Sequence, residues 1–181
     1  MRLFAAVDPP PEAVAHLVDA LDARDERLRW VRPDQWHITT AFYGDVDPDT
    51  AADLRERLGR AARRTPSLTL QLAGAGAFSR PRAARVLWTG VDGDTEGLRR
   101  LADRCRAAGG RIGIELKAER FRPHLTLARS RRAPVDVTGN IAALASYVGP
   151  SWTAGSLRLV RSTLGSAAHH ETYDEWALGP T

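Results

Sequence analysis

The sequence predicts one mixed domain of strands and helices that is built as two similar halves. Its 181 residues suit a single domain of ordinary size. Hydrophobic periods of two and of about 3.6 alternate along the chain, with no linker or low-complexity segment between them. A His-x-Thr-x motif also occurs twice, at residues 37–40 and 124–127. Because each half contains one motif strand and at least one helix, the order of elements predicts an internal duplication.

The first half begins with an apolar strand and a helix. Residues 2–7 predict the strand, and Asp8 is expected to cap the helix, whose start is marked by prolines. The apolar stripe of this helix consists of Val14, Leu17, Val18 and Leu21. Residues 28–31 predict a short second strand, 36–43 the first motif strand, and 48–64 a long helix.

The first motif strand has a hydrophobic period of two, which predicts one buried and one open face. The row expected to face the core consists of Trp36, Ile38, Thr40 and Phe42. The row expected to face a cleft consists of His37, Thr39, Ala41 and Tyr43. Tyr43 is therefore the candidate for stacking on a nucleobase beside the motif.

The second half repeats the alternation of elements. Residues 68–72 and 85–91 predict strands that pair as a hairpin, and a helix is predicted over 95–108, with Gly109-Gly110 as its stop. The second motif strand covers residues 124–129. The remaining predicted elements are a short helix over 141–148 and strands over 157–164 and 172–178.

Each motif places an imidazole and a hydroxyl on one face of a strand, about 6.5–7 Å apart. Across one cleft, His37 and His124 would supply a general acid and a general base, because an imidazole can be neutral or protonated near neutral pH. Thr39 and Thr126 are expected to donate hydrogen bonds to non-bridging phosphate oxygens. Arg129 would add a charge-assisted contact to the same oxygens. The pattern indicates phosphate-ester chemistry without a metal.

Charge and cysteine content limit the class of protein. The net charge of +4 favours an anionic partner such as nucleic acid. Only Lys117 of the 26 basic residues is lysine, so an arginine-rich composition is an equally good explanation. Cys105 stands alone and no Cys/His ligand cluster occurs, so we expect no disulfide, no metal and a cytoplasmic location. The apolar N-terminal run is too short for a signal peptide or a membrane span.

The paired motifs resemble those of the two-histidine phosphoesterase superfamily. The flanking sequence is similar to its RNA 2′,3′-cyclic phosphodiesterase branch, also called 2′-5′ RNA ligase. The similar segments are residues 1–8, 28–33, 86–88 and 121–129. Together they extend the resemblance over essentially the whole chain.

This resemblance implies an α+β fold with pseudo-twofold symmetry over residues 1–181, in which each of two lobes is an antiparallel sheet with covering helices around a central cleft. It implies that His37 donates a proton to the 3′ oxygen and that His124 accepts one from water, so that the product keeps a 2′-phosphate. Arg129 matches a phosphate-binding position. No cofactor, metal, membrane or obligate protein partner is implied, and the substrate would be an RNA end.

Three other functions stay open at this point. The same site would suit a 2′-5′ RNA ligase or phosphodiesterase, or a small cyclic nucleotide as substrate. A non-enzymatic RNA-binding module would not require two titrating histidines.

Two positions depart from the pattern of the branch. Ala41 stands where the branch usually has arginine, and the pair His169-His170 at the tip of the closing hairpin is unfamiliar. A polar pair at a hairpin tip is expected to be solvated, and its role is open.

Overall fold

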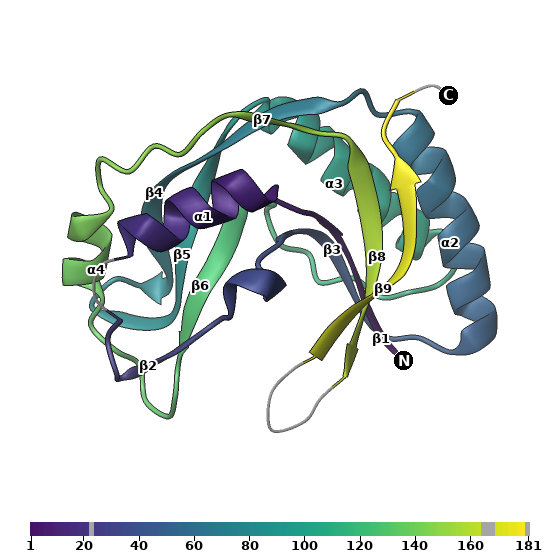
Figure 1. The fold of residues 1–181 in the computed structure, drawn as a ribbon. Coiled ribbons are helices and arrows are strands. Elements are labelled where there is room, and N and C mark those ends of the chain that lie inside the picture. The colour runs from purple at the N-terminus through teal and green to yellow at the C-terminus, as the bar shows by residue number, and fades with distance from the viewer. Residues whose placement is uncertain (22–23, 164–168, 180–181) are drawn as a thin grey trace.

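The computed structural model describes residues 1–21, 24–163 and 169–179, which form two antiparallel sheets and four α-helices (Figure 1). The strand orders are β3-β1-β8-β9 and β2-β6-β5-β4-β7. The predicted α+β class with one antiparallel sheet per motif is therefore confirmed. None of the described helices is long and apolar enough to cross a membrane.

The first sheet joins strands from both ends of the chain. It consists of β1 (Arg2–Val7), β3 (Ile38–Asp45), β8 (Ser156–Thr163) and β9 (His169–Ala177). β1 lies between β3 and β8, which explains why its run of apolar residues is buried on both faces. The two sheets consequently do not correspond to the N-terminal and C-terminal halves of the sequence.

The second sheet contains the predicted central hairpin. It consists of β2 (Leu28–Trp30), β6 (His124–Ser130), β5 (Ala83–Gly93), β4 (Leu68–Arg80) and β7 (Trp152–Ala154). The β4–β5 hairpin is longer than its apolar alternation predicts, because the Gly- and Ala-rich residues 73–77 continue β4. β6, the second motif strand, pairs with both β2 and β5.

The helices cover the sheets on their outer sides. α2 (Pro48–Arg63) and α3 (Thr95–Gly110) pack against each other beside the first sheet, and α1 (Pro11–Ala20) crosses in front of the second sheet (Figure 1). α4 (Thr138–Ala143) lies at the far end of the second sheet, and a single 3₁₀ turn (Pro33–Gln35) precedes the first motif.

The helix boundaries correct three predictions. Pro10 occupies the N-cap of α1, and Asp8 pairs with Arg158 instead of capping the helix. The pair Gly109-Gly110 forms the last turn of α3 rather than its stop. α4 ends at Ala143 instead of extending to residue 148, because the following residues form turns. α2 and α3 do have aspartate caps. The side chains of Asp47 and Asp94 accept hydrogen bonds from the backbone N–H groups three residues later.

Candidate active site

The two motif histidines make the same hydrogen bond from the ring to a backbone carbonyl oxygen. Nδ1 of His37 lies 2.8 Å from the carbonyl oxygen of Gln35, and Nδ1 of His124 lies 2.7 Å from that of Arg122. A carbonyl oxygen only accepts, so Nδ1 carries the hydrogen in both rings. Nε2 is therefore the atom of each ring that is left for proton exchange, as acid or base.

Aromatic rings hold each histidine in place from its own sheet. The ring of His37 stacks on Phe4 of β1, with centroids 4.7 Å apart. The ring of His124 meets Phe78 of β4 edge to face at 4.9 Å and lies 6.1 Å from Trp88 of β5. These contacts restrict the ring positions, because aromatic pairs of this geometry are attractive. No local sequence pattern signals them, since all three contacts join distant segments.

A bulge interrupts the alternation of β3 directly after Thr39, the threonine of the first motif. The register with β1 skips Thr40, because Thr39 and Ala41 pair with consecutive residues of β1. Thr40 and Ala41 are both buried, whereas Phe42 is 47 % exposed. The prediction that Phe42 belongs to the core row is therefore wrong, and Ala41, which is expected to face the cleft, borders the groove but is almost fully buried. Phe42 instead lines the same groove as Thr39.

The prediction that Tyr43 offers a stacking face beside His37 is also wrong. The bulge turns Tyr43 into the core, where its hydroxyl donates a hydrogen bond of 3.0 Å to the carbonyl oxygen of Cys105. Gly109 of α3 leaves room for the ring, since a Cβ there would lie 2.9 Å from it. Burial raises the pKa of Tyr43 well above its usual value. The exposed aromatic ring of β3 is that of Phe42.

β6 has a bulge at the corresponding position, three residues after its motif histidine. Its register with β5 skips Leu127, and Leu127 and Ala128 are both buried. Uninterrupted alternation would send Arg129 to the face opposite Thr126, and the bulge returns it to the same face. Arg129 and Phe42 thus occupy equivalent positions, each five residues after the histidine of its strand.

His170 is part of the surroundings of His37. Its ring lies 5.3 Å from the ring of His37 and 5.1 Å from that of Phe4, edge-on in both cases. The expectation that the pair His169-His170 is solvated holds for exposed His169 and is wrong for His170, which is half-buried. The hairpin tip itself, residues 164–168, lies outside the described residues. The sheet order β1-β8-β9 brings His170 to the first motif, which no local pattern could indicate.

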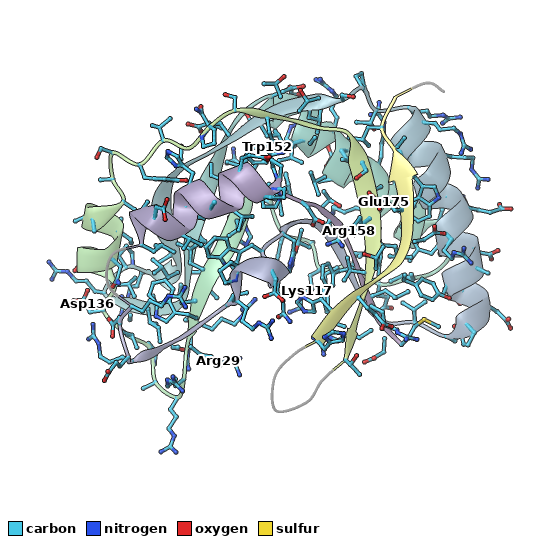
Figure 2. All side chains as sticks on the ribbon, viewed as in Figure 1. Arg29, Lys117, Asp136, Trp152, Arg158 and Glu175 are labelled. Carbon is cyan, nitrogen blue, oxygen red and sulfur yellow. The ribbon has the colours of Figure 1, made fainter. Side chains whose placement is uncertain are left out.

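An ion pair lies in the same sheet as His37. Nε of Arg158 lies 2.6 Å from Oδ2 of Asp8, which directly follows β1. Arg158 is labelled on β8 in Figure 2. Its Nη1 also donates to Oγ1 of Thr172 at 2.6 Å. Burial raises the pKa of Asp8, and the Arg158 guanidinium opposes this rise. Arg158 is the second cation, beside Arg129, whose charge reaches His37.

Burial keeps both motif histidines neutral near neutral pH. It lowers the pKa of His37 to about 4, and the positive charges of His170, Arg158 and Arg129 act in the same direction. Burial also lowers the pKa of His124, with smaller contributions from Arg129 and Arg122. The charge of Arg129 lowers the pKa of both motif histidines. Burial lowers the pKa of Arg129 itself.

A groove of about 1060 Å³ joins the two motifs to the segment between α3 and β6. Thr39 and His124 both line it. Its phenylalanine and tyrosine lining consists of Phe42, Tyr43, Phe78 and Phe121, its cationic lining of Arg106, Lys117, Arg120 and Arg122, and its acidic lining of Glu115 and Glu119. Within the described part of the chain, no three His, Cys, Asp or Glu side chains gather where they could hold a metal ion. The groove suits an anionic ligand with planar rings.

Comparison with known proteins places the chain in one family. The family described as LigT like phosphoesterase matches residues 6–88. The RNA 2′,3′-cyclic phosphodiesterases of Aeropyrum pernix, Escherichia coli and Archaeoglobus fulgidus are 36 %, 34 % and 30 % identical over 120, 138 and 167 residues. These matches cover 66 %, 75 % and 91 % of this chain and 67 %, 76 % and 92 % of the relatives.

Solved structures agree with this placement over the full length. TT0787 of Thermus thermophilus aligns with a TM-score of 0.83 at 27 % identity, covering 99 % of both chains. E. coli LigT complexed with 3′-AMP aligns with a TM-score of 0.81 at 30 % identity, covering 98 % of this chain and 97 % of that chain. The chain belongs to the LigT-like phosphoesterase family.

Proposed function

We propose that this protein hydrolyses 2′,3′-cyclic phosphate ends of RNA to 2′-phosphomonoesters, without a metal or cofactor. The observation that carries the proposal is the paired arrangement of two histidines with the same Nδ1 hydrogen bond, each followed two residues later by a threonine. The names of the curated relatives support the substrate. A cytoplasmic location is part of the same proposal.

His124 and His37 divide the proton transfers. Nε2 of His124 takes a proton from water as the water oxygen attacks phosphorus. The bond from phosphorus to the 3′ oxygen breaks, and Nε2 of His37 gives that oxygen a proton. Thr39, Thr126 and Arg129 hold the non-bridging oxygens, whose charge grows in the transition state. The product keeps its phosphate on the 2′ oxygen, and proton exchange with solvent restores both rings.

The protonation states follow from the burial of the two rings. A neutral His124 is ready to act as a base. His37, with a pKa of about 4 in the free protein, must gain a proton to act as an acid. The cyclic phosphate carries a negative charge, which raises the pKa of a neighbouring imidazole. Substrate binding therefore recruits the proton that His37 later donates.

The groove favours an RNA end over a small cyclic nucleotide. Its volume of about 1060 Å³ exceeds the range of roughly 300–1000 Å³ that is common for small-molecule sites. Aromatic rings and four cations line it beside two glutamates, and grooves that stack bases and follow a phosphate backbone combine such rings and cations. Phe42 takes the stacking role that the sequence assigned to Tyr43, because its ring is exposed in the groove.

One assay tests this function against its alternatives. Purified protein is incubated with excess chelator and an RNA ending in a 2′,3′-cyclic phosphate, and the product is digested with enzymes specific for each phosphate position. We expect a 2′-phosphate and undiminished rate. A 3′-phosphate product would reverse the roles of the histidines, and loss of activity in chelator would refute the metal-free mechanism. A 2′-5′ linked dinucleotide and a cyclic mononucleotide serve as competing substrates.

A further inference from the structure

A second hollow, of about 490 Å³, lies between α2 and α3. Five arginines line it, and we refer to them together as the arginine groove. They are Arg57, Arg60 and Arg64 from α2 and its end, and Arg104 and Arg111 from α3 and its end. The other lining residues are Ala61, Ala107, Ala108 and Asp103. The hollow is therefore cationic on both walls, with small apolar residues between them.

Helical spacing explains why the arginines gather there. Arg57, Arg60 and Arg64 are three and four residues apart, so they share one face of α2. Arg104 and Arg111 are seven residues apart, which is close to two turns of α3. Because the two helices pack against each other, these faces meet across the hollow. Two rows of like charge side by side are unfavourable without an anion between them.

The charges of the arginine groove are poorly compensated from within the protein. Asp103 already accepts a hydrogen bond of 3.0 Å from Arg99, which lies outside the groove. Arg60 pairs with Glu56 at 3.1 Å, and Arg104 donates to the hydroxyl of Thr65. In the part of the chain that the structure describes, the arginines of the groove without an ion pair are Arg57, Arg64, Arg104 and Arg111.

Some other arginines of the same two helices form ion pairs. Arg55 pairs with Asp174 at 2.7 Å, Arg99 with Asp103 at 3.0 Å, and Arg100 with Glu96 at 3.3 Å. Arg63 and Arg106, which lie on the same helices outside the groove, have no ion pair among the described residues either, and Arg60 inside the groove has one. What distinguishes the groove is that four arginines without an ion pair gather at one hollow, which leaves room for a ligand that supplies negative charge.

α3 separates the arginine groove from the groove of about 1060 Å³ beside the two motifs, which we refer to as the catalytic groove. Arg106 lines the catalytic groove, and Arg104 and Arg111 line the other. Both hollows thus adjoin the C-terminal half of the same helix. The two hollows therefore share α3 as a common wall.

We propose that the arginine groove binds the phosphodiester backbone of the RNA strand upstream of the reacting end. Guanidinium groups bind phosphate oxygens in a bidentate manner. The floor of alanines contains no aromatic side chain that could stack a base, so contacts are made to the backbone and are independent of base sequence. The identity of the strand rests on the proposed function, whereas binding of a polyanion is measurable without catalysis.

A pair of triple variants with equal charge change tests the inference. The groove variant is Arg57→Gln, Arg64→Gln and Arg111→Gln. The matched control is Arg55→Gln, Arg99→Gln and Arg100→Gln, which removes paired arginines from the same helices. Binding of a 20-nucleotide RNA with a 3′-hydroxyl end is measured by fluorescence anisotropy between 50 and 200 mM salt. Turnover is measured on a cyclic-phosphate dinucleotide and on a cyclic-phosphate 20-mer, and thermal unfolding checks the fold of both variants.

The salt dependence gives the decisive result. Each phosphate contact to a single strand contributes about 0.7 to the slope of log K against log salt, so three lost contacts lower the slope by about 2. Between 50 and 200 mM salt, the parent should therefore lose about 16-fold more affinity than the groove variant. We expect turnover of the 20-mer to fall in the groove variant alone, with turnover of the dinucleotide unchanged.

Two outcomes would overturn the inference. If the groove variant keeps the slope of the parent, its arginines do not contact phosphates. If both triple variants lose affinity and slope equally, net charge is responsible and the groove is not a site. Failure of the parent to hydrolyse either cyclic substrate would refute the proposed function alone, because the anisotropy result is independent of turnover.

Discussion

The β3 and β6 motif strands share a backbone and differ in what surrounds it. Both hold a histidine through Nδ1 and a carbonyl two residues earlier, and both have a bulge after the threonine. The residue that each bulge returns to the motif face is Phe42 in β3 and Arg129 in β6. Neighbouring strands add His170 and Arg158 to one histidine, and Phe78 and Trp88 to the other.

The surroundings of the two histidines differ more than the motifs do. The two motifs are chemically equivalent as sequence, so the proposed roles of His37 as acid and His124 as base come from the resemblance to the family. Burial and the charges of Arg158 and Arg129 lower the pKa of His37 to about 4. In the proposed mechanism, His37 gains its proton when the anionic substrate binds.

Removing either histidine should have the largest effect on this pair. We expect His37→Ala and His124→Ala each to lower kcat by about 10²–10⁴-fold, because each removes one positioned proton transfer. His169→Ala serves as the control, since the side chain of His169 is exposed. Near-parental kcat in either motif variant, measured with the cyclic-phosphate RNA, would refute the two-histidine mechanism.

The equivalent positions Arg129 and Phe42 should respond differently to truncation. Arg129→Ala should lower kcat by about 10²-fold, because it removes donors to oxygens that gain charge in the transition state. Phe42→Ala should mainly raise KM, by about 5-fold or more, in line with about 1–3 kcal/mol for stacking of a base on an aromatic ring. Steady-state kinetics on RNA separate the two. Equal effects on kcat would show that the bulges do not differentiate the strands.

Replacing His170 should shift the pH dependence through His37. His170→Asn removes a ring that buries His37, and this change raises the pKa of His37. Burial lowers the pKa of His170 itself, so the lost positive charge adds to this rise only at pH values where His170 is protonated. Because the acid must be protonated, kcat/KM falls as pH rises above that pKa, so this limb should move to higher pH. Arg158 and Arg129 still face His37 and limit the size of the shift.

The neighbouring His169 provides the matched control for that shift. His169→Asn should leave the high-pH limb in place, because its side chain is exposed. His170→Phe keeps a ring against Phe4 and His37 while removing the titrating group, so a smaller shift than in His170→Asn would separate burial from charge. An unchanged limb in all three variants would exclude His170 from the proton chemistry.

The smallest expected effect concerns the packing of Trp88, which lies beside His124. A Cβ at Gly76 would overlap the indole of Trp88, so Gly76→Ala must displace a ring that stands beside His124. We expect the free energy of unfolding to fall by about 1–3 kcal/mol, as for other overpacked sites. Denaturant unfolding measures it. A parental midpoint would mean that the indole has another position available at no cost.

The sequence predicted the long helix α2, the central hairpin and the two motif strands, of which β3 begins at Ile38, directly after His37. The chemistry of the motifs stays a prediction. The sequence could not predict the bulges, because their positions depend on pairing between β1 and β3 and between β5 and β6. One skipped residue exchanged the roles of Phe42 and Tyr43 and returned Arg129 to the motif face. The alternation of apolar and polar residues predicts which face a side chain occupies only where the strand has no bulge.

Long-range contacts account for the remaining differences. His170 reaches His37 only because β9 lies two strands away from β1 in the same sheet, and Asp8 meets Arg158 because β8 is the neighbour of β1. Both residues have an ordinary local explanation, a solvated tip and a helix cap. The sheet order, which local patterns do not encode, overrides that explanation in each case.

A substrate with sulfur in place of the 3′ oxygen tests the division of roles most directly. A thiolate, with a pKa near 8.5 for an ordinary thiol, leaves without the proton that an alkoxide needs. We predict that this cyclic phosphorothiolate restores His37→Ala to near the rate of the parent protein, while His124→Ala stays slow because water activation is still missing. Rescue of His124→Ala instead of His37→Ala would contradict the assignment of His37 as acid and His124 as base.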